Sequence, residues 1–105
     1  MDITVKTTAQ AQALREIWQI AGNLQRATVS LTRQINEVQA NLATGLNLPH
    51  LPSQQFEEVT ALHAQVPLAA RLALAVGLTS VEISAAQVAG AGDDWINIQV
   101  EATED

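Results

Sequence analysis

Apolar residues between positions 8 and 44 recur at spacings that alternate between three and four. This is the pattern of the a and d positions of a heptad repeat, and it continues for about four heptads without a proline. A helix over 8–44 would be about 55 Å long, roughly twice the diameter of a compact chain of this length. We therefore expect the pattern to pack against a second copy of the chain. The predicted oligomer interface consists of Leu14, Ile17, Ala21, Leu24, Thr28, Leu31, Ile35, Val38 and Leu42.

The positions that flank this heptad pattern carry no charge, so interhelical salt bridges cannot select the partner. Trp18 and Ile20 widen the apolar face near the start of the helix. A wider face suits additional packing against the C-terminal part of the same chain. Gly22 and Thr28 lower the helix propensity locally, which predicts a kink or a helix crossing.

The middle of the chain has two further helical signals. Gly45 is predicted to end the long helix in the left-handed conformation, and 45–52 form a linker that contains two prolines. Ser53 is a good N-cap for a helix that ends at position 65, and Pro67 suits the first turn of a next helix. That next helix is predicted to end at Gly77. We therefore expect a pair of short helices over 53–77.

Both ends of the chain alternate between apolar and polar residues, over 2–7 and 95–101, which is typical of half-buried strands. The segment 79–89 allows two interpretations. Thr79 and Glu82 match a capping box that begins a helix, whereas Val81 and Ile83 alternate like a strand. We favour the strand, because the Gly- and Asp-rich turn that follows it, before a second alternating run, is a hairpin signal. This predicts an antiparallel sheet of about three strands.

The fold class expected from these elements is α+β. It combines the long N-terminal helix over 8–44, the linker, the helical pair, a strand-rich C-terminal part over 79–102, and a small antiparallel sheet built from the terminal segments. A length of 105 residues suits a single domain. The apolar content of 48% favours a packed core, and the aromatic content of 3% means that this core is aliphatic and rich in alanine.

Charge and cysteine content exclude several classes of function. A net charge of −6, with only five Lys and Arg residues, argues against nucleic acid as a partner. The absence of cysteine excludes disulfides, thiolate metal sites and a cysteine nucleophile. The most apolar segment, 66–78, contains Arg71 and is shorter than the roughly 20 residues of a membrane span. We expect a soluble, cytoplasmic protein.

Candidate catalytic and metal-binding residues are few. Glu57, Glu58 and His63 are the most plausible metal ligands, but their separations of five and six residues do not place them on one helical face. Acidic residues are also common in the first turns of a helix, and the pair Asp93 and Asp94 suits a turn. We therefore expect no catalytic residue, no metal and no cofactor.

The heptad pattern is the most specific feature of the chain. It indicates a non-enzymatic, self-associating assembly, adaptor or scaffold protein whose partner is a second copy of itself, with another protein as a further possible partner. The alternative is a small ligand-binding or regulatory domain with an apolar pocket between the sheet and the helices. A third hypothesis is an enzyme that uses Glu57, Glu58 and His63 as metal ligands.

Overall fold

The first half of the molecule is dominated by the helix α1, which spans Thr8–Ala43. The computed structural model describes residues 2–43, 45 and 53–104. Thr7 caps the start of α1, because its Oγ1 accepts a hydrogen bond of 3.1 Å from the amide of Gln10. Beyond the helix Gly45 has a φ of 77° and donates to the carbonyl of Leu42 at 3.2 Å. The long helix and its left-handed glycine are confirmed, and the rest of the predicted linker lies outside the described residues.

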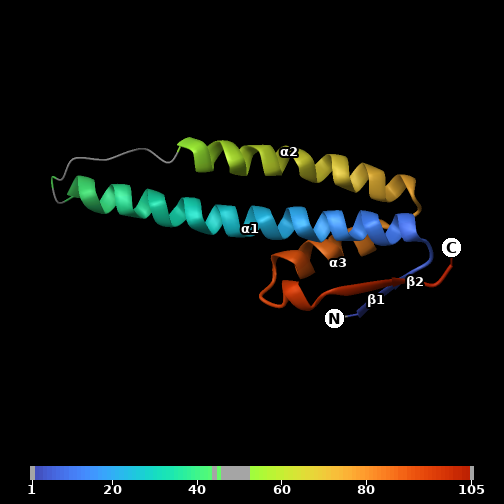
Figure 1. Ribbon diagram of the computed structural model, residues 1–105. Helices are drawn as coiled ribbons and strands as arrows, with labels where there is room; N and C mark the ends of the chain where they lie inside the picture. Colours follow the sequence, from blue (N-terminus) through green and yellow to red (C-terminus); the bar gives the residue numbers. More distant parts are fainter. Residues whose placement is uncertain (1, 44, 46–52, 105) are drawn as a thin grey trace.

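The helix α2 covers Ser53–Ala75 and returns antiparallel to α1 (Figure 1). It is one helix, so the predicted pair of short helices is wrong. Ser53, the predicted N-cap, is the first residue of this helix that the structure describes. The face of α2 that packs on α1 keeps three–four spacing along the whole helix, through Gln55, Val59, Leu62, Val66, Ala69 and Ala73.

Pro67 lies inside α2 without ending it. Proline removes one backbone hydrogen bond and costs about 3 kcal/mol in a helix interior. Its side chain is exposed, on the side away from α1, so the carbonyl that loses its partner lies toward solvent. Packing against α1 on both sides of Pro67 offsets this cost. The predicted end at Gly77 is confirmed, since Gly77 has a φ of 96° and Leu78 donates to the carbonyl of Ala73 at 3.0 Å.

The segment after α2 forms the helix α3, Ser80–Ala91, so the strand favoured for 79–89 is wrong. Its N-terminus is a capping box in which the amide of Glu82 donates to Thr79 Oγ1 at 3.2 Å. In return, the amide of Thr79 donates to Glu82 Oε1 at 3.0 Å. The hydrogen bonds of this capping box favour a helix, and they outweigh the alternation of Val81 and Ile83, which favoured a strand.

The two terminal strands, β1 (Asp2–Val5) and β2 (Gln99–Ala102), pair in parallel, with Ile3 opposite Val100. The predicted antiparallel sheet is therefore wrong, and the chain is mostly helical rather than α+β. Because 79–91 form a helix that runs beside α1 in the same direction, the chain comes back along β2 in the direction of β1 (Figure 1). A hairpin at 90–94 would have paired 79–89 with 95–101 in an antiparallel sheet.

The alternating run at 95–101 is only partly a strand. Trp95–Asn97 form the short 3-10 helix η1, and Ile96 is 69% exposed instead of buried. Ile98 is half-buried and Val100 is buried against α1. The predicted apolar face is thus correct at its C-terminal end and wrong at Ile96.

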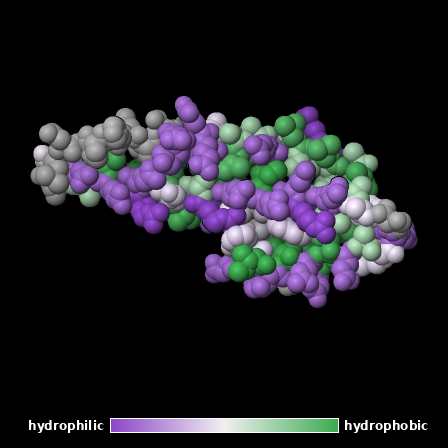
Figure 2. Space-filling model, in the orientation of Figure 1, coloured by the Kyte–Doolittle hydropathy of each residue, from purple (hydrophilic) through white to green (hydrophobic). Residues whose placement is uncertain are grey.

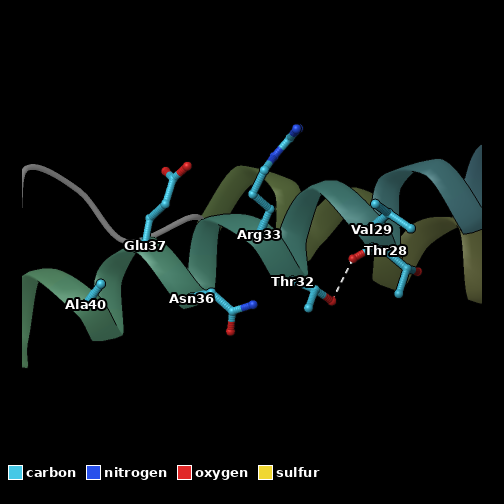
Figure 3. Close-up of a pocket in the computed structure, with 7 residues that line it drawn as sticks. All are labelled: Thr28, Val29, Thr32, Arg33, Asn36, Glu37 and Ala40. Carbon is cyan, nitrogen blue, oxygen red and sulfur yellow. Dashed lines mark hydrogen bonds between the residues drawn. The ribbon is translucent and has the colours of Figure 1, made fainter.

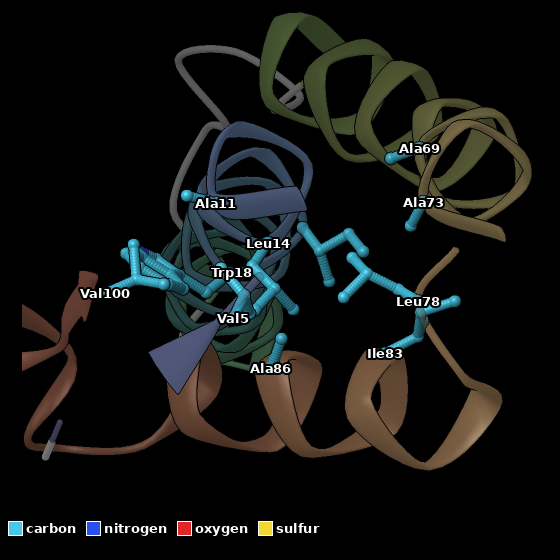
Figure 4. Close-up of a cluster of buried hydrophobic side chains, with 11 residues drawn as sticks. Val5, Ala11, Leu14, Trp18, Ala69, Ala73, Leu78, Ile83, Ala86 and Val100 are labelled. Atoms are coloured by element: carbon cyan, nitrogen blue, oxygen red, sulfur yellow. The ribbon is translucent and has the colours of Figure 1, made fainter. Parts of the chain in front are cut away.

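The hydrophobic core lies at one end of the molecule, where α1 passes between α2 on one side and α3 with the sheet on the other (Figure 4). We call this end, residues 2–27 and 67–104, the base. The remaining parts of α1 and α2, residues 28–43 and 53–66, form a two-helix arm that extends from it (Figure 1). The molecule measures 61 × 24 × 18 Å, and its radius of gyration of 17.6 Å exceeds the value of about 13 Å for a compact chain of this length.

Two glycines bring α3 into backbone contact with α1. A Cβ atom added to Gly90 would lie 2.2 Å from the carbonyl oxygen of Trp18, and one added to Gly22 would lie 2.7 Å from the carbonyl oxygen of Gly90. No side chain larger than hydrogen fits at either position unless the helices separate. The sequence predicted a kink or a helix crossing near Gly22 and Thr28, and the close contact between α1 and α3 lies at Gly22.

Candidate interaction surface

The predicted heptad residues of α1 divide into two rows with different surroundings. The row Ile17, Leu24, Leu31 and Val38 is buried or half-buried over its whole length, because α2 runs along it. The second row is buried at its start in the base and exposed in the arm. Leu14 is 1% exposed and Ala21 is half-buried, whereas Thr28 is exposed, Ile35 is 40% exposed and Leu42 is 61% exposed. We call Thr28, Ile35 and Leu42 the open row.

The length of α3 explains this difference. In the base, Leu14 belongs to one cluster with Ala73 of α2 and Ala86 of α3, so it is covered from both sides (Figure 4). α3 has 12 residues against 36 for α1, or about 18 Å against 54 Å, and its C-terminal end reaches only to Gly22. The segment that follows α3, including Trp95 of η1, still lies beside Arg26 and Arg33. Farther along the arm, α2 is the only helix beside α1 among the described residues. The open row is therefore the continuation, in the arm, of a row that is buried in the base.

Phe56 adds an aromatic side chain at the same end of the molecule. It is 62% exposed in the first turns of α2, which lie near the end of α1 because the two helices are antiparallel. Phe56 is not among the interface residues predicted from the sequence. The three–four spacing from Gln55 to Ala73 identifies the face of α2 that packs on α1. Position 56 is not on that face, so the sequence could have shown that Phe56 points away from α1.

Exposed apolar side chains also occur in the base, notably Val81 and Val88 on α3 and Leu72 and Leu74 on α2. Figure 2 shows hydrophobic residues over α2 and below α1 at this end of the molecule. Single exposed apolar residues are ordinary on protein surfaces. The open row differs because it continues a buried heptad position into a region that has lost its third helix.

A hollow of about 510 Å³ runs along α1 in the arm and shares Thr28 with the open row. The described residues that line it all lie on this helix: Thr28, Val29, Thr32, Arg33, Asn36, Glu37 and Ala40. Figure 3 shows these side chains spread to either side of the helix, with a hydrogen bond of 2.9 Å from Thr32 Oγ1 to the carbonyl of Thr28. Among the described residues, this hollow has no opposite wall. It is an uncovered helix face rather than an enclosed ligand site.

A second hollow, of about 330 Å³, lies where the end of α3 and η1 meet α1, with Arg26, Arg33, Asp93 and Trp95 among its lining residues. A third, of about 370 Å³, lies between α1 and α2 and is lined in part by Gln19, Asn23 and Leu72. Neither includes a residue of β1 or β2. These hollows do not correspond to the pocket that the sequence analysis placed between the sheet and the helices.

The structure does not bring the predicted metal ligands together. Glu57, Glu58 and His63 are all exposed on α2, and His63 is rotated about 140° from Glu58 and about 240° from Glu57 around the helix axis. Within residues 2–43, 45 and 53–104, no three His, Asp or Glu side chains are grouped closely enough to hold a metal ion. His50 lies outside the described residues.

Comparison with known proteins gives no match. No family model matches the chain, and no curated protein or solved structure matches it. Among the described helices, none combines the length and the apolar character that crossing a membrane requires.

Proposed function

We propose that this protein is a non-enzymatic, self-associating scaffold or adaptor, and that the arm of one copy packs against the arm of a second copy. The observation that carries the proposal is the rise in exposure from Leu14 to Leu42 along one heptad row. Heptad positions of this kind are buried in coiled coils and bundles. The open row has the residue pattern of a buried position without the neighbour that would bury it.

A second copy fits this surface for three reasons. Two antiparallel two-helix arms give a four-helix bundle, in which each open row gains neighbours from the other arm. A two-fold contact uses the same patch on both copies, so one row is sufficient for both. The open row and Phe56 are uncharged, so no like charges are buried in the contact although the chain has a net charge of −6.

Burial of Leu42 and Phe56 supplies a substantial driving force. Complete burial of a large apolar side chain contributes about 1.5–3 kcal/mol, and a two-fold contact buries each residue twice. The cost of association offsets part of this gain. We therefore expect a dimer that dissociates on dilution. Contact with a further protein and a cytoplasmic location belong to the same proposal.

Light scattering on purified protein tests the proposal. We expect the wild-type mass at tens of micromolar to be twice 11.2 kDa, and the double variant Ile35→Glu with Leu42→Glu to have the mass of one chain. Both positions are exposed, so helical circular dichroism should not change. Substitutions at Leu24 or Leu31 are less informative, because α2 covers these residues and a charge there would disrupt the arm itself.

Leu72→Glu is the matched control. Leu72 is an exposed leucine of α2 beside Gln19 and Asn23, and Asn23 lies about 140° around α1 from Thr28. We expect this variant to remain a dimer. A monomeric wild-type protein, or a dimer that Leu72→Glu dissociates and the double variant does not, contradicts the proposed interface.

A further inference from the structure

Two of the five basic residues of this acidic chain meet in one hollow. Arg26 and Arg33 lie one heptad apart on the same side of α1, and both line the hollow of about 330 Å³ at the end of α3. The same hollow is lined by Asp93 and Trp95, which follow α3 in the chain. Charges of both signs and an aromatic ring thus surround a single small space.

The position of Arg26 is fixed by its neighbours. Its guanidinium carbon lies 3.9 Å from the centre of the Trp95 ring, and its Nη2 donates to Asn23 Oδ1 at 2.8 Å. Gly22 leaves the necessary space, because a Cβ atom there would lie 3.0 Å from Nη1 of Arg26. A cation held in this way is already positioned before a ligand arrives.

Arg33 and Asp93 have no hydrogen-bonding or ionic partner within the part of the chain that the structure describes. Asp93 comes shortly after the C-terminal end of α3, where the last helical carbonyls carry partial negative charge. The lining of the hollow therefore carries positive charge from α1 and negative charge from the segment that follows α3.

The segment after α3 that carries Asp94 and Trp95 is also held in place. The amide of Asn97 donates to the carbonyl of Asp94 at 3.0 Å, and Asn97 Nδ2 donates to Asp94 Oδ1 at 2.5 Å. These bonds brace η1, which carries Trp95. The indole is 39% exposed, so part of its surface is available to a ligand while Arg26 covers one face.

We infer that this hollow binds a small zwitterion, an apolar α-amino acid. The carboxylate would accept two parallel hydrogen bonds from the guanidinium of Arg33, and the ammonium group would lie beside Asp93 and the end of α3. The apolar side chain would contact Val29 and Trp95, which line the same space. A simple anion would meet Asp93 and a simple cation would meet both arginines, so the charges favour a ligand that carries both signs. This inference does not depend on self-association.

Titration of the full chain with L-leucine, followed by the fluorescence of its two tryptophans, tests the inference. Trp18 is buried in the core, so a saturable change is expected to come from Trp95 and to be lost in Trp95→Phe. N-acetyl-L-leucine lacks the ammonium group and L-leucinamide lacks the carboxylate. We expect each analogue to bind at least tenfold more weakly than L-leucine.

Matched variants locate the binding. Arg33→Gln and Asp93→Asn should each weaken L-leucine binding at least tenfold and leave helical circular dichroism unchanged. Arg71→Gln and Glu58→Gln remove exposed charges of α2 outside the hollow and should bind as the wild type does. The inference is overturned if L-leucine gives no saturable change, if either analogue binds as tightly, or if the control variants weaken binding as much as the hollow variants.

Discussion

The base and the arm share the helix α1 and the same heptad pattern, yet they bury that pattern to different extents. Leu14 in the base is 1% exposed, and Leu42, four heptads later in the same row, is 61% exposed. The residues are of the same type and differ only in their neighbours. The comparison shows that periodicity identifies which side chains favour burial, whereas the lengths of the surrounding elements decide which of them the chain itself can bury.

The largest difference between base and arm should appear when leucine is shortened in each. We expect Leu14→Ala to lower the free energy of unfolding by about 2–5 kcal/mol, because it leaves a cavity in a cluster that cannot collapse around it. Leu42→Ala should change the same quantity by less than about 0.5 kcal/mol at a concentration where the chain is monomeric. Urea unfolding of both variants measures this. Equal losses would contradict the division into base and arm.

The contact between α1 and α3 should be the next most sensitive feature of the base. We expect Gly90→Ala to destabilise the fold by about 1–3 kcal/mol, because its methyl group would overlap the backbone at Trp18. Gly92→Ala is the control, since a Cβ atom there would lie 3.5 Å from its nearest neighbours. Thermal unfolding of the two variants compares them. A neutral Gly90→Ala would mean that α3 does not cover α1 as closely as described.

Substitutions at two residues of the C-terminal segment test which part of that segment packs into the base. Val100 is buried and Ile96 is 69% exposed. At about 0.8 kcal/mol per buried carbon, Val100→Ala should cost about 1–2 kcal/mol of unfolding free energy. Ile96→Ala should cost much less. Chemical unfolding measures both losses. A larger loss for Ile96→Ala than for Val100→Ala would contradict the exposure of Ile96 and would support the strand face predicted from the sequence.

The smallest effect concerns threonine hydroxyl groups in the two regions. Thr79→Ala removes the capping box of α3 and should destabilise the base by about 1 kcal/mol. Thr60→Ala removes a hydrogen bond to the carbonyl of Phe56 on the exposed surface of α2, which contributes little to helix stability. Differential scanning calorimetry should detect a lower melting temperature only for Thr79→Ala.

Local signals explain which parts of the fold were predictable. The helix 8–44 and the turns at Gly45 and Gly77 follow from periodicity and from the preference of glycine for positive φ. Continuation of α2 through Pro67 depends on tertiary packing, which local rules do not include. The capping box at Thr79 was visible in the sequence. Because the alternation of Val81 and Ile83 was preferred to it, a hairpin and an antiparallel sheet were predicted.

The candidate sites were predictable only in part. The heptad pattern identified Ile35 and Leu42, but it could not separate them from Leu14 and Ile17, because the separation depends on where α3 ends. The hollow between Arg26 and Trp95 was not predictable, since the two residues are far apart in the chain and meet only through the crossing of α1 and α3.

Amide hydrogen exchange measured at several protein concentrations tests the central claim most directly, because it reports on base and arm in one experiment. If the arms associate, protection over 28–43 and 53–66 should increase with concentration, whereas protection of α3 and of the first half of α1 should stay constant. Protection of the arm that does not depend on concentration, or a concentration-dependent change confined to the base, would contradict the proposed interface.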